Sequence, residues 1–340
     1  MNNNVTKTLI KFLLRTKFED LPPEVISSTK RVILDTIGAT LAGVPTDIGL
    51  IFYSLVRDFG GRPESTIVGS GEKSSCLNAA MVNAKIANAL DCDDTFLNYS
   101  HLSSVSVLSA LSMAERGNAC GKDLLLTVAL AYDLTARVGS ALILPGGARG
   151  GGLSWLIIGS IVPAIKLLRL GLDKALNAVG IGCSNAPVPS ARKSCSIPVS
   201  MVKYADMGII AYTGILSALL AQKGYTGSKT VLEGEDGFWK MCGAEDCDYE
   251  LMLKELGSKW YILEASFKLY PCCRWIHIPL DLTKRIMHEQ NLKFEDIDEV
   301  TLRVNPFIKR VSAVGMPEDG INAQFNLGYN LALLCLAVEP

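Results

Sequence analysis

The segment NALDCDDTFLNYSH, residues 88–101, places three aspartates within four positions and ends on one of the chain's three histidines. Acidic side chains are seldom buried without partners, so this cluster indicates either a site or a solvated helix end. Asp91 and Asp94 share a face if the preceding helix continues through them, whereas Asp93 points elsewhere. His101 is suited to moving protons at neutral pH, because an unperturbed imidazole has a pKa of about 6.5.

Simpler interpretations of this segment stay open. The aspartates would then solvate a helix end, and His101 would be a hydrogen-bonded structural histidine. Mg²⁺ binding is less favoured, because no second acidic cluster of similar density occurs in the sequence. None of the ten cysteines forms a CxxC pair, and neither a phosphate-binding GxxxxGKS/T loop nor a GxGxxG turn is present. We therefore expect neither a metal nor a nucleotide cofactor.

Isolated cations border apolar segments in two further places. Lys203 precedes the uncharged run MGIIAYTGILSALLAQ, where a lone cation has to find an anion or reach solvent. KLYPCCRWIHIPLD, residues 268–281, carries Lys268, Arg274 and His277. Arginine can grip a carboxylate through two hydrogen bonds, and lysine acts as a point charge. We expect Lys203, Lys268 and Arg274 to converge on one anion-binding cleft. A structural helix start with an exposed arginine is the alternative for the second segment.

The overall charge is balanced, with 33 Lys and Arg against 34 Asp and Glu and a formal charge of −1. This balance gives no electrostatic basis for binding nucleic acid or an anionic membrane surface. The uncharged apolar run from Met207 to Gln222 has 16 residues, fewer than the ~20 apolar residues that cross a bilayer. The cysteines are scattered and no secretory signal is evident, a pattern typical of reduced thiols in a cytoplasmic protein.

Helical signals dominate the first 260 residues. Residues 21–43 begin with prolines in a first-turn position, carry apolar residues three and four apart, and end at Gly43. Residues 121–139 repeat this scheme, and residues 207–222 are predicted to form a further helix rich in small residues. The amphipathic N-terminal segment is expected to dock on the core as a helix. The segment 144–154 contains five glycines and is expected to be a loop.

The character of the sequence changes near Trp260. KWYILEASFKLYP has the β-branched and aromatic content of a strand, residues 278–292 follow a helical pattern, and EVTLRVN at 299–305 alternates as a half-buried strand does. These patterns predict a mainly α protein. A large helical domain at residues 1–265 is followed by a smaller, incomplete α+β lid at residues 266–340.

The last segment, FNLGYNLALLCLAVEP, begins a helix near Asn326. Its leucines cover most of the helix circumference, as in a helix buried on all sides. We expect an exposed apolar patch here, and hence self-association as a homodimer. The leucines are Leu327, Leu331, Leu333, Leu334 and Leu336.

These features together resemble the MmgE/PrpD family, which includes 2-methylcitrate dehydratase, cis-aconitate decarboxylase and iminodisuccinate epimerase. The matching segments follow the family order and cover nearly the whole chain. They are LDTIGATLAG (34–43), NALDCDDTFLNYSH (88–101), CGKDLLLTVALAYDLTARVG (120–139), the segment around Lys203, GYTGSKTVLEGEDGF (224–238), KLYPCCRWIH (268–277) and AQFNLGY (323–329).

The resemblance implies a cleft between a helical domain and a lid, with proton abstraction from a small di- or tricarboxylate and no metal or organic cofactor. The residues that it places at catalytic positions are Asp91, His101, Lys203, Lys268 and Tyr329. Asp91 is expected to orient His101, and the cations are expected to stabilise the enolate-like charge that develops. Arg274, His277 and Asp94 are expected to contact the substrate.

Two histidines of the cis-aconitate decarboxylase pattern are absent from this sequence. One belongs to the segment aligned with GGGLSWLIIG, and the other, in the lid, falls at or near Cys273. The sequence therefore favours dehydration, as in 2-methylcitrate dehydratase, over epimerisation or decarboxylation. Chains of the family also continue beyond AQFNLGY, so a C-terminal truncation at Pro340 is expected. An inactive remnant that serves as a structural or interaction protein is the alternative from another class.

Overall fold

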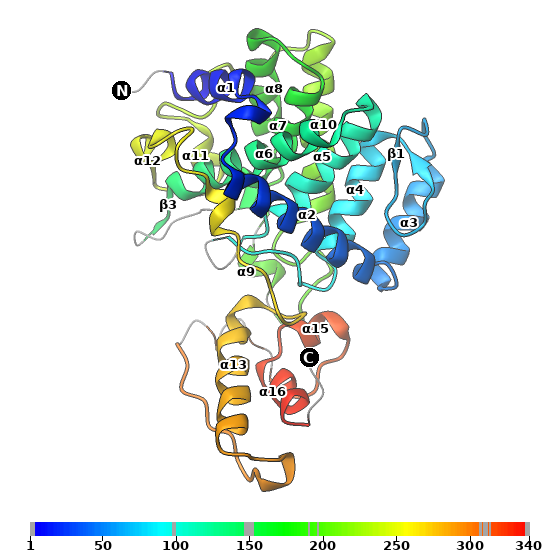
Figure 1. Ribbon diagram of the computed structural model, residues 1–340, viewed down its shortest axis with the longest axis vertical. Helices are drawn as coiled ribbons and strands as arrows, with labels where there is room; N and C mark the ends of the chain where they lie inside the picture. Colours follow the sequence, from blue (N-terminus) through cyan, green and yellow to red (C-terminus); the bar gives the residue numbers. More distant parts are fainter. Residues whose placement is uncertain are drawn as a thin grey trace.

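The structure, a computed structural model, shows a broad helical body that carries the N-terminus and a narrower unit below it that holds the C-terminal part of the chain (Figure 1). The yellow segment of the ribbon leads from the body to the smaller unit. The residues that the structure describes are 4–96, 100–145, 153–189, 191–195, 197–305, 308, 312 and 314–336.

The protein is mainly α, as predicted. The α-helices of the body are α1 (Val5–Arg15), α2 (Pro23–Gly43), α3 (Asp47–Phe59), α4 (Cys76–Ala87), α5 (Ser103–Gly117), α6 (Gly121–Ala141), α7 (Ile158–Leu167), α8 (Leu172–Ser184), α9 (Ala191–Ser194), α10 (Met207–Gln222), α11 (Phe238–Met241) and α12 (Tyr249–Leu253). Those of the smaller unit are α13 (Arg274–Glu289), α15 (Gly320–Gln324) and α16 (Leu327–Cys335). Short 3₁₀ helices are η1 (Phe18–Asp20), η3 (Leu153–Ile157), η4 (Tyr261–Glu264) and η5 (Phe294–Asp296).

Short antiparallel ladders close loops of the body. Strand β1 (Ser65–Thr66) pairs with β2 (Lys73–Ser74), with Ser65 opposite Ser74. Strand β3 (Leu142–Ile143) pairs with β4 (Asp246–Cys247), with Leu142 opposite Cys247. These two-residue strands join neighbouring loops and form no sheet that could carry a site, so the helices provide the scaffold.

Helix α6 runs through the centre of the body and packs against α5 and α7. It is long and apolar enough to cross a membrane by length and composition, but 89% of its apolar window is buried inside the protein. Helices α2 and α3 pass the same test only as one bent pair, and their axes meet at 88°. The burial of α6 is that of a core helix around which the others are arranged.

Arg137 of α6 connects the core to the segment that leads toward the smaller unit. The guanidinium is fully buried and donates to Asp133 Oδ2 (2.7 Å) and to the carbonyl oxygens of Lys254 and Lys259 (both 2.7 Å). Asp133 Oδ1 in turn accepts a hydrogen bond from the backbone N–H of Tyr261 (2.9 Å). A buried ion pair of this kind is held in place by its additional hydrogen bonds. The Arg137–Asp133 pair thereby fixes the backbone of residues 254–261, from which the chain continues to Lys268.

The long helical patterns of the sequence are confirmed. Residues 21–43, 121–139 and 207–222 correspond to α2, α6 and α10, and the N-terminal segment docks on the core as α1. The glycine-rich segment 144–154 lies largely outside the described residues, since only its two ends are described.

The strand predictions after Trp260 were wrong. Tyr261–Glu264 is a 3₁₀ helix, and beyond it a single bridge joins Ser266 to Thr95. Residues 299–305 belong to no strand in the described part of the chain, although Leu302 and Val304 pack against the core of the smaller unit. Alternating burial produces the sequence pattern, but a strand also needs a hydrogen-bonded neighbour. The described part of the lid is therefore helical with extended connections rather than α+β.

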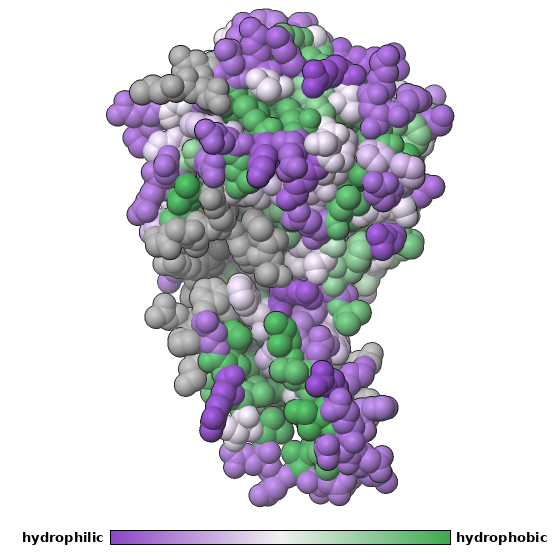
Figure 2. All heavy atoms as spheres, turned by 60° about the vertical axis from the view of Figure 1, so that its left-hand side comes forward, coloured by the Kyte–Doolittle hydropathy of each residue, from purple (hydrophilic) through white to green (hydrophobic). Residues whose placement is uncertain are grey.

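The smaller unit has its own apolar core between α13 and α16. Helix α16 begins at Leu327, where Asn326 accepts a hydrogen bond from the backbone N–H of Tyr329 (2.8 Å), close to the predicted start. Leu331 and Leu334 are buried, whereas Leu336 is 49% exposed. Figure 2 shows further apolar side chains on the surface of this unit. Exposed apolar residues of α13 are Ile278, Leu282 and Ile286, whose side chains are 50–70% exposed.

Helix α2 approaches α4 so closely at Gly43 that a side chain does not fit. A Cβ there would collide with the carbonyl oxygen of Ile86 and lie 2.9 Å from its Cγ2. We predict that Gly43→Ala lowers the free energy of unfolding by about 1–3 kcal/mol through overpacking. Gly38→Ala in the same helix is the control. It meets nothing within 4 Å and should stabilise by up to about 1 kcal/mol. Equal urea midpoints for the two variants would contradict the close approach.

Candidate functional site

The acidic cluster of residues 91–94 is buried in the protein interior. Helix α4 ends at Ala87, and Asp91 adopts the left-handed backbone conformation (φ 54°), which aspartate tolerates better than most residues. Asp91, Asp93 and Asp94 are all 0% exposed. The helix therefore does not continue through the cluster, and the interpretation of a solvated helix end is wrong.

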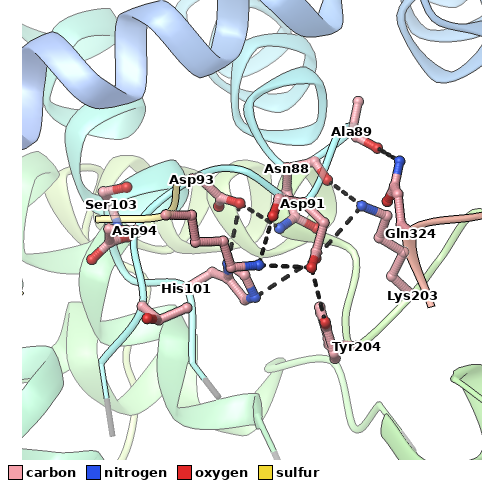
Figure 3. A network of polar contacts seen from close by, with 12 residues as sticks. Asn88, Ala89, Asp91, Asp93, Asp94, His101, Ser103, Lys203, Tyr204 and Gln324 are labelled. Carbon is pink, nitrogen blue, oxygen red and sulfur yellow. Dashed lines mark hydrogen bonds and ion pairs between the residues drawn. The ribbon is translucent and has the colours of Figure 1, made fainter. Parts of the chain in front are cut away.

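Two lysines surround the carboxylate of Asp91 (Figure 3). Lys268 Nζ donates to Asp91 Oδ2 (2.7 Å) and to the Asp91 carbonyl oxygen (2.6 Å). Lys203 Nζ lies 3.7 Å from Asp91 Oδ1 and donates to the carbonyl oxygen of Asn88 (2.6 Å). Lys203 also has a left-handed backbone (φ 56°). The structure thus brings together two of the three cations that were expected to converge.

The two lysines differ in their electrostatics. Burial lowers the pKa of Lys203 to about 8, although Asp91 and Asp93 oppose the shift. Burial also acts against the charge of Lys268, but the nearby Asp91 and Asp93 raise its pKa above the usual value. Burial would raise the pKa of Asp91, yet Lys268, Lys203 and His101 hold it below its ordinary range. Asp91 and Lys268 therefore stay charged at neutral pH, while Lys203 is close to titration.

His101 lies between two carboxylates, and Asp93 is the nearer one. Its Nδ1 is 3.1 Å from Asp93 Oδ1, and its Nε2 is 3.8 Å from Asp91 Oδ1. Asn88 Nδ2 donates to the same Asp93 oxygen (2.9 Å). The pKa of Asp93, which burial would raise, is lowered because His101 is close. The carboxylate nearest to His101 is thus that of Asp93, whereas Asp91 was expected to orient it. Helical spacing had placed Asp93 on the wrong side, because the turn at Asp91 interrupts the helix.

Tyr204 is a second residue of the site that the sequence did not reveal. Its ring stacks on the His101 imidazole, with centroids 5.0 Å apart and planes inclined by 26°. Its hydroxyl donates to Asp91 Oδ2 (3.2 Å). Tyr204 directly follows Lys203, but no spacing rule marks a single tyrosine as part of a site.

Asp94 faces the core of the body and is engaged by protein donors. Tyr132 donates its hydroxyl to Asp94 Oδ2 (2.6 Å), and the backbone N–H of Ser103 donates to Oδ1 (2.9 Å). Burial raises the pKa of Asp94. Asp94 therefore holds the start of α5 through the backbone of Ser103. The geometry does not support its predicted role as a substrate contact.

Among the described residues, the remaining predicted residues of the smaller unit make no hydrogen bond or ion pair with the carboxylate of Asp91. Arg274 donates to Ser266 Oγ (3.0 Å) and lies 3.5 Å from His277 Nδ1. Burial, with the charge of Lys268, lowers the pKa of His277 to about 4, so this imidazole is neutral at pH 7. Tyr329 lies on α16, and no hydrogen bond between described residues joins it to the Asp91 cluster. Arg274 thus does not share the carboxylate that holds the two lysines.

Several hydroxyl groups around His101 have no hydrogen-bond partner within the described residues. Ser100, Ser103 and Ser104 are fully buried and belong to this group. Buried polar groups are nearly always hydrogen-bonded, so these hydroxyls have unused hydrogen-bonding capacity. No group of three or more His, Cys, Asp or Glu side chains with metal-binding geometry occurs in the parts of the chain that are described.

The buried lysines depend on the charge of Asp91. We predict that Asp91→Asn lowers the free energy of unfolding by about 3–5 kcal/mol, because it removes the nearest countercharge of two buried cations. Asp173→Asn removes an exposed partner of Lys229, whose side chain is itself 49% exposed, and should cost less than about 1 kcal/mol. Chemical denaturation of the two variants provides the comparison. A loss for Asp91→Asn no larger than that for Asp173→Asn would show that the cluster is not stabilising.

Comparison with known proteins gives a consistent result along the chain. Residues 7–250 match the model of the MmgE/PrpD N-terminal domain, and residues 270–338 match that of the MmgE/PrpD C-terminal domain. A cis-aconitate decarboxylase of Aspergillus terreus is 28% identical over 301 residues, covering 84% of this chain and 60% of that protein. The human cis-aconitate decarboxylase is 28% identical over 322 residues, covering 89% of this chain and 65% of that protein.

A cis-aconitate decarboxylase-like protein of Aspergillus oryzae is 26% identical over 309 residues, covering 86% of this chain and 63% of that protein. The chain thus spans between 60% and 65% of the length of these relatives. The two domain models between them match most of the chain. Asp91, His101 and Lys203 lie within the segment of the first model, and Lys268 lies between the two matched segments. On these grounds the chain belongs to the MmgE/PrpD family.

Proposed function

We propose that this protein is a cofactor-independent lyase that acts on a small di- or tricarboxylate by abstracting a proton next to a carboxylate. The observation that carries the proposal is the placement of His101 between Asp93 and Asp91, with Lys203 and Lys268 against the same carboxylate of Asp91. This combination offers a proton acceptor and fixed positive charge within one buried cluster.

Each part of the cluster has a role in such a reaction. Asp93 holds Nδ1 of His101, which leaves Nε2 as the atom that accepts or returns a proton. Removing a proton next to a carboxylate creates an enolate-like charge. Lys268 and Lys203 are positive groups that stabilise such a charge in a site from which water is largely excluded. Their present partner, Asp91, keeps them in place before a substrate carboxylate arrives.

Two reactions of this class are the first to test. Decarboxylation of cis-aconitate is supported by the names of the similar proteins. Dehydration of the 2-methylcitrate type is supported by a difference at the lid, where Cys273 occupies the position expected for a histidine. The Cys273 thiol is buried, which raises its pKa, so it stays protonated at neutral pH and is not a base.

NMR spectra of the purified chain with cis-aconitate, 2-methylcitrate, citrate and iminodisuccinate distinguish these reactions by their products. Turnover of one of these acids is the expected result, and the product identifies the reaction. A folded chain that leaves all four unchanged would support the inactive alternative instead.

His101 is the main acid/base in this proposal. Replacing it by alanine should lower kcat by at least ~10²-fold, the usual effect of removing a positioned proton-transfer group. His288→Ala is the matched control, since His288 lies on the exposed face of α13, and it should keep the activity of the unmodified chain. Steady-state rates of both variants, with circular dichroism to check folding, test the role. Near-normal turnover in folded His101→Ala would remove His101 from the mechanism.

The charge of Lys203 should set an alkaline limit to activity. Its protonated form predominates below pH 8 and its neutral form above, because burial lowers the pKa to about 8. We predict that kcat/KM falls as pH rises through this value. In Lys203→Arg the charge persists to much higher pH, so the alkaline fall should move upward, whereas the exposed control Lys229→Arg should leave it in place. An unchanged alkaline limb in Lys203→Arg would contradict the assignment.

A further inference from the structure

The orientation of the His101 ring depends on few contacts in the described residues. Asp93 lies at ion-pair distance from one ring nitrogen, and Asp91 is farther from the other at 3.8 Å. A single contact at one nitrogen restrains the position of that atom but leaves the plane of the ring free to tilt about it. Something else has to set the plane if Nε2 is to meet a substrate in a constant direction.

Tyr204 supplies that second restraint. Its ring lies against one face of the imidazole, with the planes only 26° apart. Its hydroxyl is tied to Asp91, which itself is held by Lys268 and Lys203 (Figure 3). The tyrosine is therefore anchored at its polar end, and its flat face fixes the imidazole plane.

The ring of Tyr204 also contacts a residue of the smaller unit, Phe325. The ring of Phe325 lies 5.6 Å from that of Tyr204, at an inclination of 56°. Phe325 is buried in the core of the smaller unit and directly follows α15. The neighbouring Gln324 donates to the carbonyl oxygen of Ala89 (3.0 Å), and Asn322 Oδ1 accepts from the backbone N–H of Val199 (2.8 Å).

These contacts place residues 322–325 across two parts of the body. One part is the turn after α4 that carries Asp91, and the other is the loop that carries Lys203 and Tyr204. Docking of residues 322–325 therefore presses Phe325 against the tyrosine that covers His101. The chain of contacts runs from the smaller unit through two aromatic rings to the proton-transfer group.

We propose that Tyr204 is a positioning residue that fixes the plane of the His101 imidazole and makes that plane depend on the docking of residues 322–325. The proposal deepens the function proposed above and relies on it for its kinetic readout alone. A tyrosine that only fills space would affect stability, whereas a positioning residue also controls the environment of the imidazole and the rate of the chemical step.

The chain has three histidines, so NMR of protein labelled with ¹³C at histidine Cε1 gives a spectrum simple enough to assign with His101→Gln and His288→Gln. Protons above an aromatic face are shielded. Tyr204→Leu should therefore move the His101 signal downfield or broaden it. Tyr204→Phe keeps the ring and should leave the signal close to its original position. Tyr212→Leu, a similar change at a half-buried tyrosine of α10, is the control and should have no effect on it.

Steady-state rates of the same variants are measured with the polycarboxylic acid that the chain turns over. Tyr204→Leu should lower kcat by up to ~10²-fold, the effect of displacing a reacting group by about an ångström, with little change in KM. Tyr204→Phe should retain most of kcat. Phe325→Leu leaves Tyr204 in place but removes the ring behind it, and should shift the His101 signal in the direction of Tyr204→Leu by a smaller amount.

The outcomes separate the two proposals. An unmoved His101 signal in folded Tyr204→Leu overturns the positioning role, and so does a shift in Tyr204→Phe or Tyr212→Leu as large as that in Tyr204→Leu. If Tyr204→Leu does not fold, Phe325→Leu decides, and an unmoved signal there overturns the dependence on docking. A moved signal in a chain that turns over no polycarboxylate supports the positioning role and counts against the proposed function alone.

Discussion

The buried carboxylate of Asp91 is the interaction on which the site depends. Removing two lysines from water is costly, and the carboxylate of Asp91 is the nearest countercharge to both of them, with Asp93 adding to its effect. Lys203 comes from the loop before α10, and Lys268 comes from the segment that enters the smaller unit. Asp91 therefore joins three parts of the chain that are distant in sequence. The arrangement of the body relative to the smaller unit and the electrostatics of the site follow from the same contact.

The helices of the body act as a rigid frame, and the chemistry lies at their ends. The acidic cluster follows the end of α4, His101 precedes α5, and Lys203 precedes α10. Side chains at such ends are aimed by backbone turns rather than by helical spacing. Asp91 and Lys203 both adopt left-handed backbone conformations, which cost energy in residues other than glycine and are retained where the surroundings fix them.

The long helices could be predicted from the sequence, because α2, α6 and α10 carry long apolar patterns with clear ends. The sequence also identified the charged residues that meet at Asp91. It did not identify which aspartate faces His101, because that depends on one backbone angle after α4. Tyr204 carries no signal of its own, since a stacking contact with a residue a hundred positions away leaves no local pattern. The strand predictions were wrong because a strand needs a hydrogen-bonded neighbouring strand, which local alternation in the sequence does not reveal.

The lysines of the site also have architectural partners. Lys203 binds the carbonyl oxygen of Asn88, and Lys268 binds those of Asp91 and Cys272. A related protein that had lost all activity would still be under selection to keep these lysines. They donate hydrogen bonds to the backbone of the turn after α4 and so stabilise it. Conservation of the two lysines in a related sequence would thus indicate a conserved fold as much as a conserved reaction. The ion-pair and ring contacts of the His101 side chain are made with other side chains. Among related sequences, replacement of this histidine by another residue would therefore indicate loss of activity.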